Sequence, residues 1–154
     1  MNSSILFVTY AQVAVFNSNL QNPFNDWNDA QVNQGFSWRE QSVSFRTLLN
    51  DVSTRVEVDM VEELTPLPNS IRVISVPFRC GEAGRVEVAT ITDTLPIDVP
   101  PGLYQLVFEA GVFDRSEPWC RFSLIANGDM SPAILRKDAE LSPEYPLTMG
   151  AHAA

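Results

Sequence analysis

The chain has 154 residues, 45% of them hydrophobic, which suffices for one compact domain with a buried core. A formal net charge of −9 argues against a protein that holds DNA or RNA through a basic surface, because phosphate affinity depends on Lys and Arg. An aromatic content of 10% argues against a disordered acidic chain, and a charged partner should be basic.

The first predicted element is an apolar run from Ile5 to Phe16, in which both alternating sets of residues are largely apolar. This pattern predicts a central or bent strand. The run lacks a basic residue before it and a small-residue cleavage site after it, and it is too short to span a bilayer. We therefore expect a strand here, no membrane span, and a cytoplasmic protein.

A short helix is predicted next, between Phe24 and Phe45. Asp26 is expected to cap it by accepting the amide hydrogen bond of Asp29, and Gly35 is expected to end it in a left-handed conformation. Trp27 is the expected anchor of the helix.

Two interpretations of this helical segment remain open. The helix closes one end of the fold, with Trp27, Phe36 and Trp38 packed beneath it. Alternatively, it presents Trp38 and Arg39 to a partner, because Trp and Arg are enriched at interface hot spots. A capping element can also be a binding surface, so both can hold.

The rest of the chain reads as strands with short connections. Val43 and Phe45 alternate with polar residues, as do Val56 and Val58, and both patterns predict half-buried strands with one wet face. Further strands are predicted at 71–78, 85–91, 95–99, 102–110 and 119–126, separated by Pro, Gly and Asn-Gly turns.

These patterns predict an all-β fold, an antiparallel β-sandwich of about eight strands with one short helix after the first strand. Residues 1–141 are expected to form one domain. Residues 142–154, which have no hydrophobic periodicity, are expected to form a loosely ordered tail.

Cys80 and Cys120 are the two cysteines, and each lies on a different predicted strand without a nearby Cys or His. The expected state is two free, part-buried thiols. A single disulfide across the sheets is the alternative, since the sequence does not tell how far apart the Cα atoms lie.

Two acidic clusters are candidate partner-binding sites. The first contains Glu57 and Asp59 on the wet face of one strand, followed by Glu62 and Glu63. An ordinary solvated strand face explains this cluster equally well.

The second acidic cluster lies in FEAGVFDRSEPW, where Glu109, Asp114 and Glu117 are expected to surround Phe113 on a loop between two strands. An aromatic residue among acids resembles a hot spot with a polar rim. A solvated loop is the alternative here.

Catalytic motifs are missing from the sequence. The sole histidine, His152, is two residues from the end, and there is no GxSxG elbow, phosphate-binding glycine loop or HExxH pair. We therefore expect no catalytic residues, no metal, no cofactor and no enzymatic activity.

Several pieces of sequence, in this order and spacing, resemble the competence protein J or DNA-entry nuclease inhibitor family. They are Val15-Phe16, DWNDAQVNQGF, Val43 to Phe45, Val76 to Phe78, and DVPPGLYQL from Asp98 to Leu106. The resemblance covers Val8 to Phe108. It implies a small protein that binds and inhibits a partner nuclease, but it supplies no set of inhibitory residues.

The acidic composition agrees with that implication, because a nuclease presents positive charge to phosphate and its inhibitor can offer carboxylates in place of the phosphates. An immunity protein against a toxin nuclease is a variant of the same hypothesis. The alternative from another class is a non-catalytic sandwich that binds a small ligand or carbohydrate through Trp38, Phe113 and Trp119. The sequence leaves the oligomeric state open.

Overall fold

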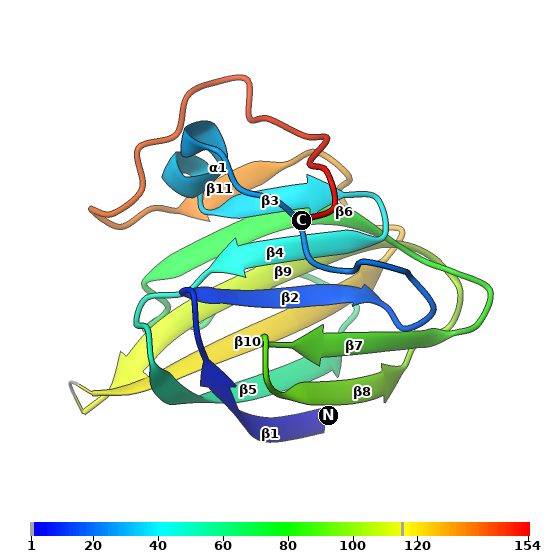
Figure 1. Cartoon of the computed structure of the whole chain (residues 1–154), viewed down its shortest axis with the longest axis horizontal. Coiled ribbons are helices and arrows are strands. Elements are labelled where there is room, and N and C mark those ends of the chain that lie inside the picture. Colours follow the sequence, from blue (N-terminus) through cyan, green and yellow to red (C-terminus); the bar gives the residue numbers. More distant parts are fainter. Residues whose placement is uncertain (1, 115) are drawn as a thin grey trace.

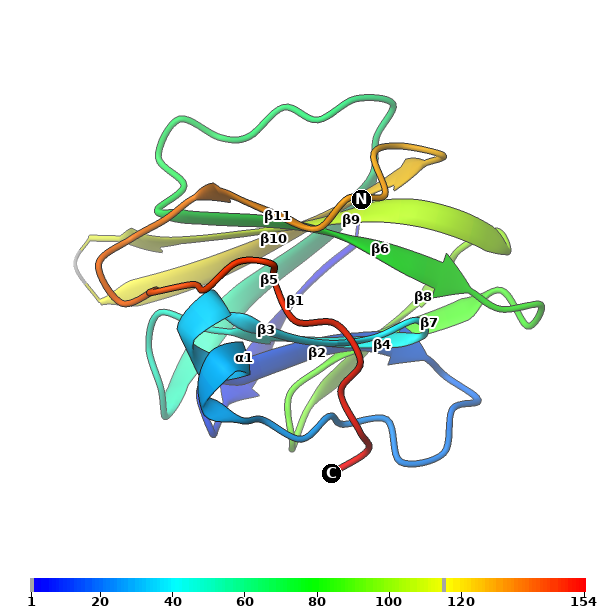
Figure 2. The ribbon, with the colours of Figure 1, turned by 90° about the horizontal axis from the view of Figure 1, so that it is seen from above.

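The computed structural model describes residues 2–114 and 116–154. In this part of the chain, two β-sheets pack face to face with one short helix, α1 (Asp29–Gln34), beside them (Figures 1 and 2). The prediction of an all-β fold is confirmed. The described residues contain more strands than the predicted number of about eight, because the first predicted strand divides in two and the short strands at Phe36–Arg39 and Ala133–Arg136 have no predicted counterpart.

The six-stranded sheet has the order β1-β5-β10-β9-β6-β11 and the five-stranded sheet has the order β3-β4-β2-β7-β8. All neighbours are antiparallel except β5 and β10, which run parallel. The strands are β1 (Asn2–Val8), β2 (Gln12–Asn17), β3 (Phe36–Arg39), β4 (Ser42–Arg46), β5 (Val52–Met60), β6 (Arg72–Cys80), β7 (Arg85–Ala89), β8 (Thr94–Asp98), β9 (Gly102–Phe113), β10 (Glu117–Ala126) and β11 (Ala133–Arg136).

The predicted first strand divides at a corner into β1, in the six-stranded sheet, and β2, in the five-stranded sheet. Tyr10 and Ala11 form the corner with φ of 56° and 49°, a left-handed conformation that residues other than Gly seldom adopt. Hydrogen bonds hold this backbone: Ala11 N–H donates to Asn50 Oδ1 at 2.8 Å, and Thr47 N–H donates to Ala11 O at 2.9 Å. The sequence predicts one central or bent strand here. In the structure, the bend carries the chain from the six-stranded sheet to the five-stranded sheet.

The core lies between the sheets and is built from the inward-facing set of each strand. Phe45 from β4 stacks on Phe108 from β9 with ring centroids 4.7 Å apart, and Phe122 from β10 packs against both rings. The strand β5 shows the predicted alternation, with Val56 and Val58 buried. The strand β4 differs from the prediction of one wet face. Its serines, Ser42 and Ser44, are buried, and Ser42 is hydrogen-bonded to the segment that leads to α1.

The helix α1 begins two positions later than the sequence predicts. Its N-cap is Asn28, whose side chain accepts from Gln31 N–H at 2.9 Å, while the Gln31 side chain accepts from Asn28 N–H at 2.7 Å. The expected cap, Asp26, instead accepts from His152 N–H at 3.0 Å. Gly35 ends the helix at φ 87°, as predicted.

Residues 126–154 follow β10 and pack against both sheets. The strand β11 pairs with β6, and Leu141 is buried in the main core. Asp138 forms a two-pronged ion pair with the fully buried guanidinium of Arg72, with both N to O distances at 2.8 Å. This buried charge on β6 is therefore neutralised from the C-terminal part of the chain.

The C-terminal tail, residues 142–154, runs alongside β3 and the segment before α1 (Figure 2). Ala151 N–H donates to Trp38 O at 2.8 Å, and Ala154 N–H donates to Phe24 O at 2.9 Å. Thr148 exchanges two hydrogen bonds with the Gln34 side chain, each 2.9 Å long. The tail thus has defined partners in the structure, while the predicted domain boundary at 141 and the looseness of the tail stay predictions.

Both cysteines are free and buried, and no disulfide joins them. Burial raises the pKa of the Cys120 thiol to about 12, although the nearby Arg72 charge acts to lower it. Burial also raises the pKa of Cys80, whose Sγ lies 3.4 Å from Val99 O. Neither thiol is placed to act as a nucleophile. Among the described residues, no helix has the length and apolarity that a membrane crossing requires.

Candidate functional site

The β9–β10 hairpin projects from one end of the sandwich (Figures 1 and 2). Phe113, the last residue of β9, faces Glu117, the first of β10, and Asp114 opens the turn with φ 43°. Phe113 is 45% exposed, and both carboxylate residues are exposed. A segment expected to be an irregular loop is therefore an extension of two long strands, with an aromatic ring and two acids at its tip.

The buried ring of Trp119 packs against the ring of Phe113, with centroids 6.0 Å apart. Its indole lies on the backbone of Gly111, where a Cβ atom would come within 2.3 Å of the ring, so only glycine fits at this position. The Trp119 Nε1–H is buried without an acceptor among the described residues. A buried donor of this kind carries an energetic penalty that an added acceptor removes.

Two adjoining cavities flank Phe113. One, of about 380 Å³, runs from the hairpin to β1 and is lined by Ile5, Val52, Ser53, Arg55, Phe113, Ser116, Glu117 and Pro118. The other, of about 120 Å³, is lined by Arg55, Glu57, Leu67, Asn69, Phe113, Trp119 and Cys120. We call the surface formed by the lining residues Ile5, Arg55, Glu57, Phe113 and Glu117, together with the exposed Asp114 at the tip, the hairpin face.

The hairpin face unites members of both acidic clusters that the sequence predicts. Glu57 comes from the first cluster, and Phe113 and Glu117 come from the second. They meet because β10 lies parallel to β5, with Arg121 opposite Glu57 in the register. Arg55 Nε lies 3.2 Å from Glu57 Oε1 on the surface, where such a pair contributes little to stability.

Glu109 does not belong to this surface, and its predicted place on a loop around Phe113 is wrong. It lies within β9 and is 1% exposed. Its Oε1 accepts hydrogen bonds from Leu67 N–H and from the Ser70 hydroxyl, both at 2.7 Å, and its Oε2 lies 3.4 Å from Arg121 Nη1. Glu109 thus holds the β5–β6 connection over the outer face of the six-stranded sheet, which Figure 2 shows as an arch.

The remaining members of the first acidic cluster lie away from Phe113. Asp59 is on β5, half-buried, and lines a separate cavity of about 160 Å³ with Asn2 and Asp98. Glu62 and Glu63 are exposed in the connection after β5 and line neither cavity of the hairpin face.

Trp38 and Arg39 are engaged inside the protein. Trp38 Nε1–H donates to Pro77 O at 2.7 Å, and its ring packs against the core. Arg39 donates to Asn25 Oδ1 at 2.6 Å and to Asn22 O at 2.7 Å. Burial lowers the pKa of Arg39, and the charge of Asp26 partly offsets this. Both side chains therefore hold the segment around α1 in place.

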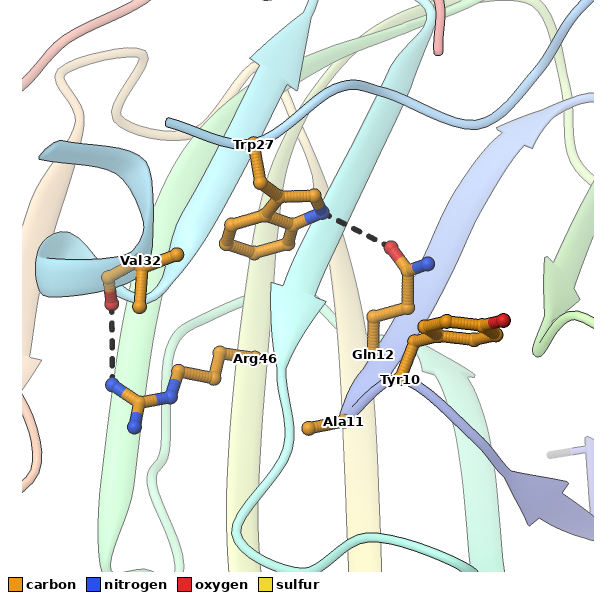
Figure 3. A pocket seen from close by; sticks show the side chains of 6 residues that line it. All are labelled: Tyr10, Ala11, Gln12, Trp27, Val32 and Arg46. Atoms are coloured by element: carbon orange, nitrogen blue, oxygen red, sulfur yellow. Dashed lines mark hydrogen bonds between the residues drawn. The ribbon is translucent and has the colours of Figure 1, made fainter. Parts of the chain in front are cut away.

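A further cavity, of about 340 Å³, lies between the β1–β2 corner and α1 (Figure 3). We call it the corner pocket, and it is lined by Tyr10, Ala11, Gln12, Trp27, Val32 and Arg46. The Trp27 Nε1–H donates to Gln12 Oε1 at 3.1 Å. The sequence does not indicate this pocket, because the pocket depends on the left-handed corner, for which the sequence carries no glycine or asparagine signal.

Metal-binding geometry is not found in the described part of the chain, where no group of three or more His, Cys, Asp or Glu side chains gathers. The single histidine is placed by its backbone, since His152 N–H donates to Asp26 and His152 O accepts from Asp26 N–H.

Comparison with known proteins identifies similar sequences and folds. The model of the family "Competence protein J (ComJ)" matches residues 5–125. A DNA-entry nuclease inhibitor from Bacillus subtilis (strain 168) is 28% identical over 102 residues, which is 66% of this chain and 75% of that protein.

Two solved structures share the fold. One is ComJ from Bacillus subtilis, described as an inhibitor of the DNA degrading activity of NucA, with a TM-score of 0.73, 21% identity, and coverage of 82% of this chain and 96% of that chain. The other is the product of crocagin biosynthetic gene J, with a TM-score of 0.53, 13% identity, and coverage of 83% of this chain and all of the other.

Proposed function

Because this chain belongs to the competence protein J family, we propose that it binds a DNA nuclease and inhibits it, without any reaction of its own. The observation that carries this proposal is the match of the family model over residues 5–125, which includes the five-stranded sheet, the hairpin, and the six-stranded sheet except β11 and the outer ends of β1 and β10. A relative described as a DNA-entry nuclease inhibitor supports the same activity.

The partner in this proposal is a basic nuclease, and the contact is the hairpin face. A nuclease holds DNA through positive charge, so carboxylates from Asp114, Glu117 and Glu57 can occupy positions that phosphates would take. The net charge of −9 would also accelerate the encounter through long-range attraction. The inhibitor would thus cover the basic active site of the nuclease.

Phe113 is the expected centre of this contact. It is an exposed aromatic residue on a rigid hairpin, with cavities on two sides and acidic residues around it. Buried aromatic anchors with a polar rim carry most of the binding energy in many interfaces. The buried Trp119 ring packs beside Phe113 and supports it, with ring centroids 6.0 Å apart.

The alternative function, a module that binds a small ligand or carbohydrate through exposed aromatics, loses two of its three rings in this structure. Trp119 is buried on Gly111, and Trp38 is bonded to Pro77 and packed on the core. Phe113 remains exposed, but one ring does not form a stacking platform. No observation favours this alternative over the inhibitor.

The test is a DNA cleavage assay with the nuclease most similar to NucA in the genome that encodes this chain. We expect cleavage to stop at a one-to-one molar ratio and expect a single complex in size-exclusion chromatography. An unrelated basic nuclease of similar charge serves as the control and should stay active. Full cleavage by the NucA-like nuclease at tenfold excess of the inhibitor would refute the proposal.

A further inference from the structure

Three connections gather at one end of the sandwich: the β1–β2 corner, the β4–β5 connection and the β9–β10 hairpin (Figures 1 and 2). The helix α1 lies toward the same end. These segments and the strand beside them carry a set of exposed large apolar side chains, which are Ile5, Phe7, Tyr10, Val32, Leu49 and Phe113. Half of the twelve exposed large apolar side chains among the described residues therefore lie in this region, which gives the acidic protein a surface suited to a protein partner.

The corner pocket has the composition of a binding hot spot. It is lined by a Trp, a Tyr and an Arg, the three residue types most enriched at such positions. Tyr10 is 79% exposed, so its ring forms a wall that reaches into solvent. Figure 3 shows the rings of Trp27 and Tyr10 on either side of the Gln12 amide. A volume of about 340 Å³ is large enough for a whole apolar side chain.

Two walls of the pocket, Arg46 and Trp27, are already held in place. Arg46 donates to Val32 O at 3.3 Å and to Glu140 O at 3.2 Å, and its Nη2 lies 3.5 Å from Glu140 Oε2. Trp27 is fixed by its hydrogen bond to Gln12. A site whose side chains are ordered before binding loses less conformational entropy when it is filled.

The charges and hydrogen-bond donors of the lining residues determine which partner side chain fits the corner pocket. The guanidinium of Arg46 is balanced by the Glu140 carboxylate, and the polar atom of Gln12 that is not bonded to Trp27 is an amide donor. A lysine or arginine from a partner would meet these donors rather than acceptors. An aromatic or branched aliphatic side chain, with its backbone carbonyl toward Gln12, matches both the apolar walls and the amide.

The pocket and the hairpin face are close enough for one interface. Ile5 lines the hairpin face and Tyr10 lines the pocket, and five residues of extended chain span at most about 17 Å. A standard interface of about 800 Å² per partner has a radius of about 16 Å if it is circular. The two sites lie on the outward faces of different sheets, because Ile5 is exposed beside the buried Leu6 and Gln12 precedes the core residue Val13. One partner therefore reaches both by contacting the end of the sandwich between them.

We infer that the corner pocket receives an apolar side chain, aromatic or branched aliphatic, from the same basic nuclease whose active site meets the hairpin face. This inference rests on the proposed function. The acids then attract the basic nuclease and orient it on the surface. The apolar side chain buried in the pocket slows dissociation of the complex.

The tyrosines of the chain provide a test with an internal control. There are three: Tyr10, which is 79% exposed, Tyr145 on the C-terminal tail, which is 70% exposed, and Tyr104, which is 3% exposed. The protein is treated briefly with tetranitromethane, alone and with excess NucA-like nuclease from the same genome, and nitration is read by peptide mass spectrometry. Inhibition of cleavage is measured in the same mixture.

The free protein should be nitrated at Tyr10 and Tyr145 and not at Tyr104. In the inhibited mixture, we expect nitration of Tyr10 to fall at least fivefold while Tyr145 is unchanged. Inhibition with unchanged nitration of Tyr10 would overturn this inference and leave the proposed function intact. Absence of inhibition would refute the proposed function itself, and the inference with it.

A variant gives a second, independent measurement. Tyr10→Asn removes the ring and keeps a residue that tolerates the left-handed backbone at φ 56°. We expect the dissociation constant of the complex to rise about tenfold, through faster dissociation, with the unfolding midpoint close to that of the unmodified protein. Tyr145→Asn is the control and should bind as the unmodified protein does. Equal affinities for the two variants would overturn the inference.

Discussion

At the C-terminal side of the sandwich, the Asp138 carboxylate is held against the fully buried guanidinium of Arg72, whereas at the hairpin tip the carboxylates of Asp114 and Glu117 are exposed. The two regions use the same chemical groups under different dielectric conditions. A buried ion pair cannot lose one partner without leaving an uncompensated charge. An exposed carboxylate contributes little to folding, so it is available for a partner.

The apolar residues of the two regions differ in the same way. Leu141, from the C-terminal part, fills the core against Gly35 and Ile74. Phe113 at the hairpin tip and Tyr10 at the β1–β2 corner are exposed beside cavities. The C-terminal side therefore supports the fold, and the hairpin end presents a surface, so substitutions in the two regions should affect different measurements.

The largest expected effect is on stability, at the buried ion pair. Arg72→Met should lower the free energy of unfolding by about 3–5 kcal/mol, because Asp138 then loses its buried partner. Urea unfolding followed by fluorescence measures this. The matched control is Arg85→Met, which removes an exposed Arg–Asp pair with Asp98 and should cost less than about 1 kcal/mol. Equal losses for the two variants would contradict the comparison.

A core substitution in the same region should have the next largest effect. Leu141→Ala should cost about 2–4 kcal/mol of unfolding free energy, because it leaves a cavity between the sheets near α1. Leu135→Ala, at an exposed position on β11, is the control and should change stability by less than about 0.5 kcal/mol. Inhibition per folded molecule should be the same for both. A stable Leu141→Ala variant would show that residues 126–154 are not part of the folding unit.

Substitutions at the hairpin end should affect the affinity for the nuclease more than the stability of the fold. Phe113→Ala should weaken nuclease binding by about 2 kcal/mol, or about 30-fold, as expected for a central aromatic anchor. Its unfolding free energy should fall by less than about 1 kcal/mol, because the ring is 45% exposed. Titration calorimetry measures the affinity. Leu103→Ala, an exposed residue at the far end of β9, is the control, and an equal affinity for both variants would remove Phe113 from the interface.

Neutralising the acids of the tip should have a smaller effect that depends on salt. In the double variant Asp114→Asn and Glu117→Gln, the association rate should fall several-fold at low ionic strength and less at high salt, because screening weakens the attraction. Stopped-flow measurements over a range of salt concentrations test this. Glu82→Gln with Glu144→Gln changes the net charge equally at exposed positions elsewhere. If both double variants slow association equally, total charge matters and the hairpin face does not.

The last prediction concerns the pH dependence of stability through the titration of Asp138. Burial would raise its pKa, but the hydrogen bond and charge of Arg72 outweigh burial and hold the pKa below its ordinary value. The pair therefore stabilises the fold fully above about pH 4, and this contribution is lost as the pH falls through the lowered pKa. Asp138→Asn should flatten the loss of stability between about pH 5 and pH 3. Parallel unfolding curves for both proteins across that range would contradict this account.

Much of the fold could be predicted from local sequence. The alternation in β5 correctly identified Val56 and Val58 as core residues, and Gly35 correctly marked the end of the helix. The helix start was misplaced, because Asp26 and Asn28 are both capping residue types and only the backbone decides between them. Strand number was underestimated, because the left-handed corner at Tyr10 divides a run that looks continuous.

The candidate site could be predicted only in part. Phe113, Glu117 and Glu57 were identified as separate pieces, and the parallel pairing of β5 with β10 brings them together. Glu109 looked equivalent to Glu117 in the sequence, yet it is buried under the β5–β6 connection. The corner pocket was not predicted, since its lining comes from β2, β4 and the segment around α1.

The sequence by itself determined that this is an acidic, all-β protein, which residues of each strand share a face, and which family it resembles. Only the tertiary structure decided which acids are exposed, which strands are neighbours, and that residues 126–154 neutralise Arg72 and fill the core. The physical reason is that side-chain alternation is a local property with a period of two, while exposure depends on contacts between residues far apart in the chain.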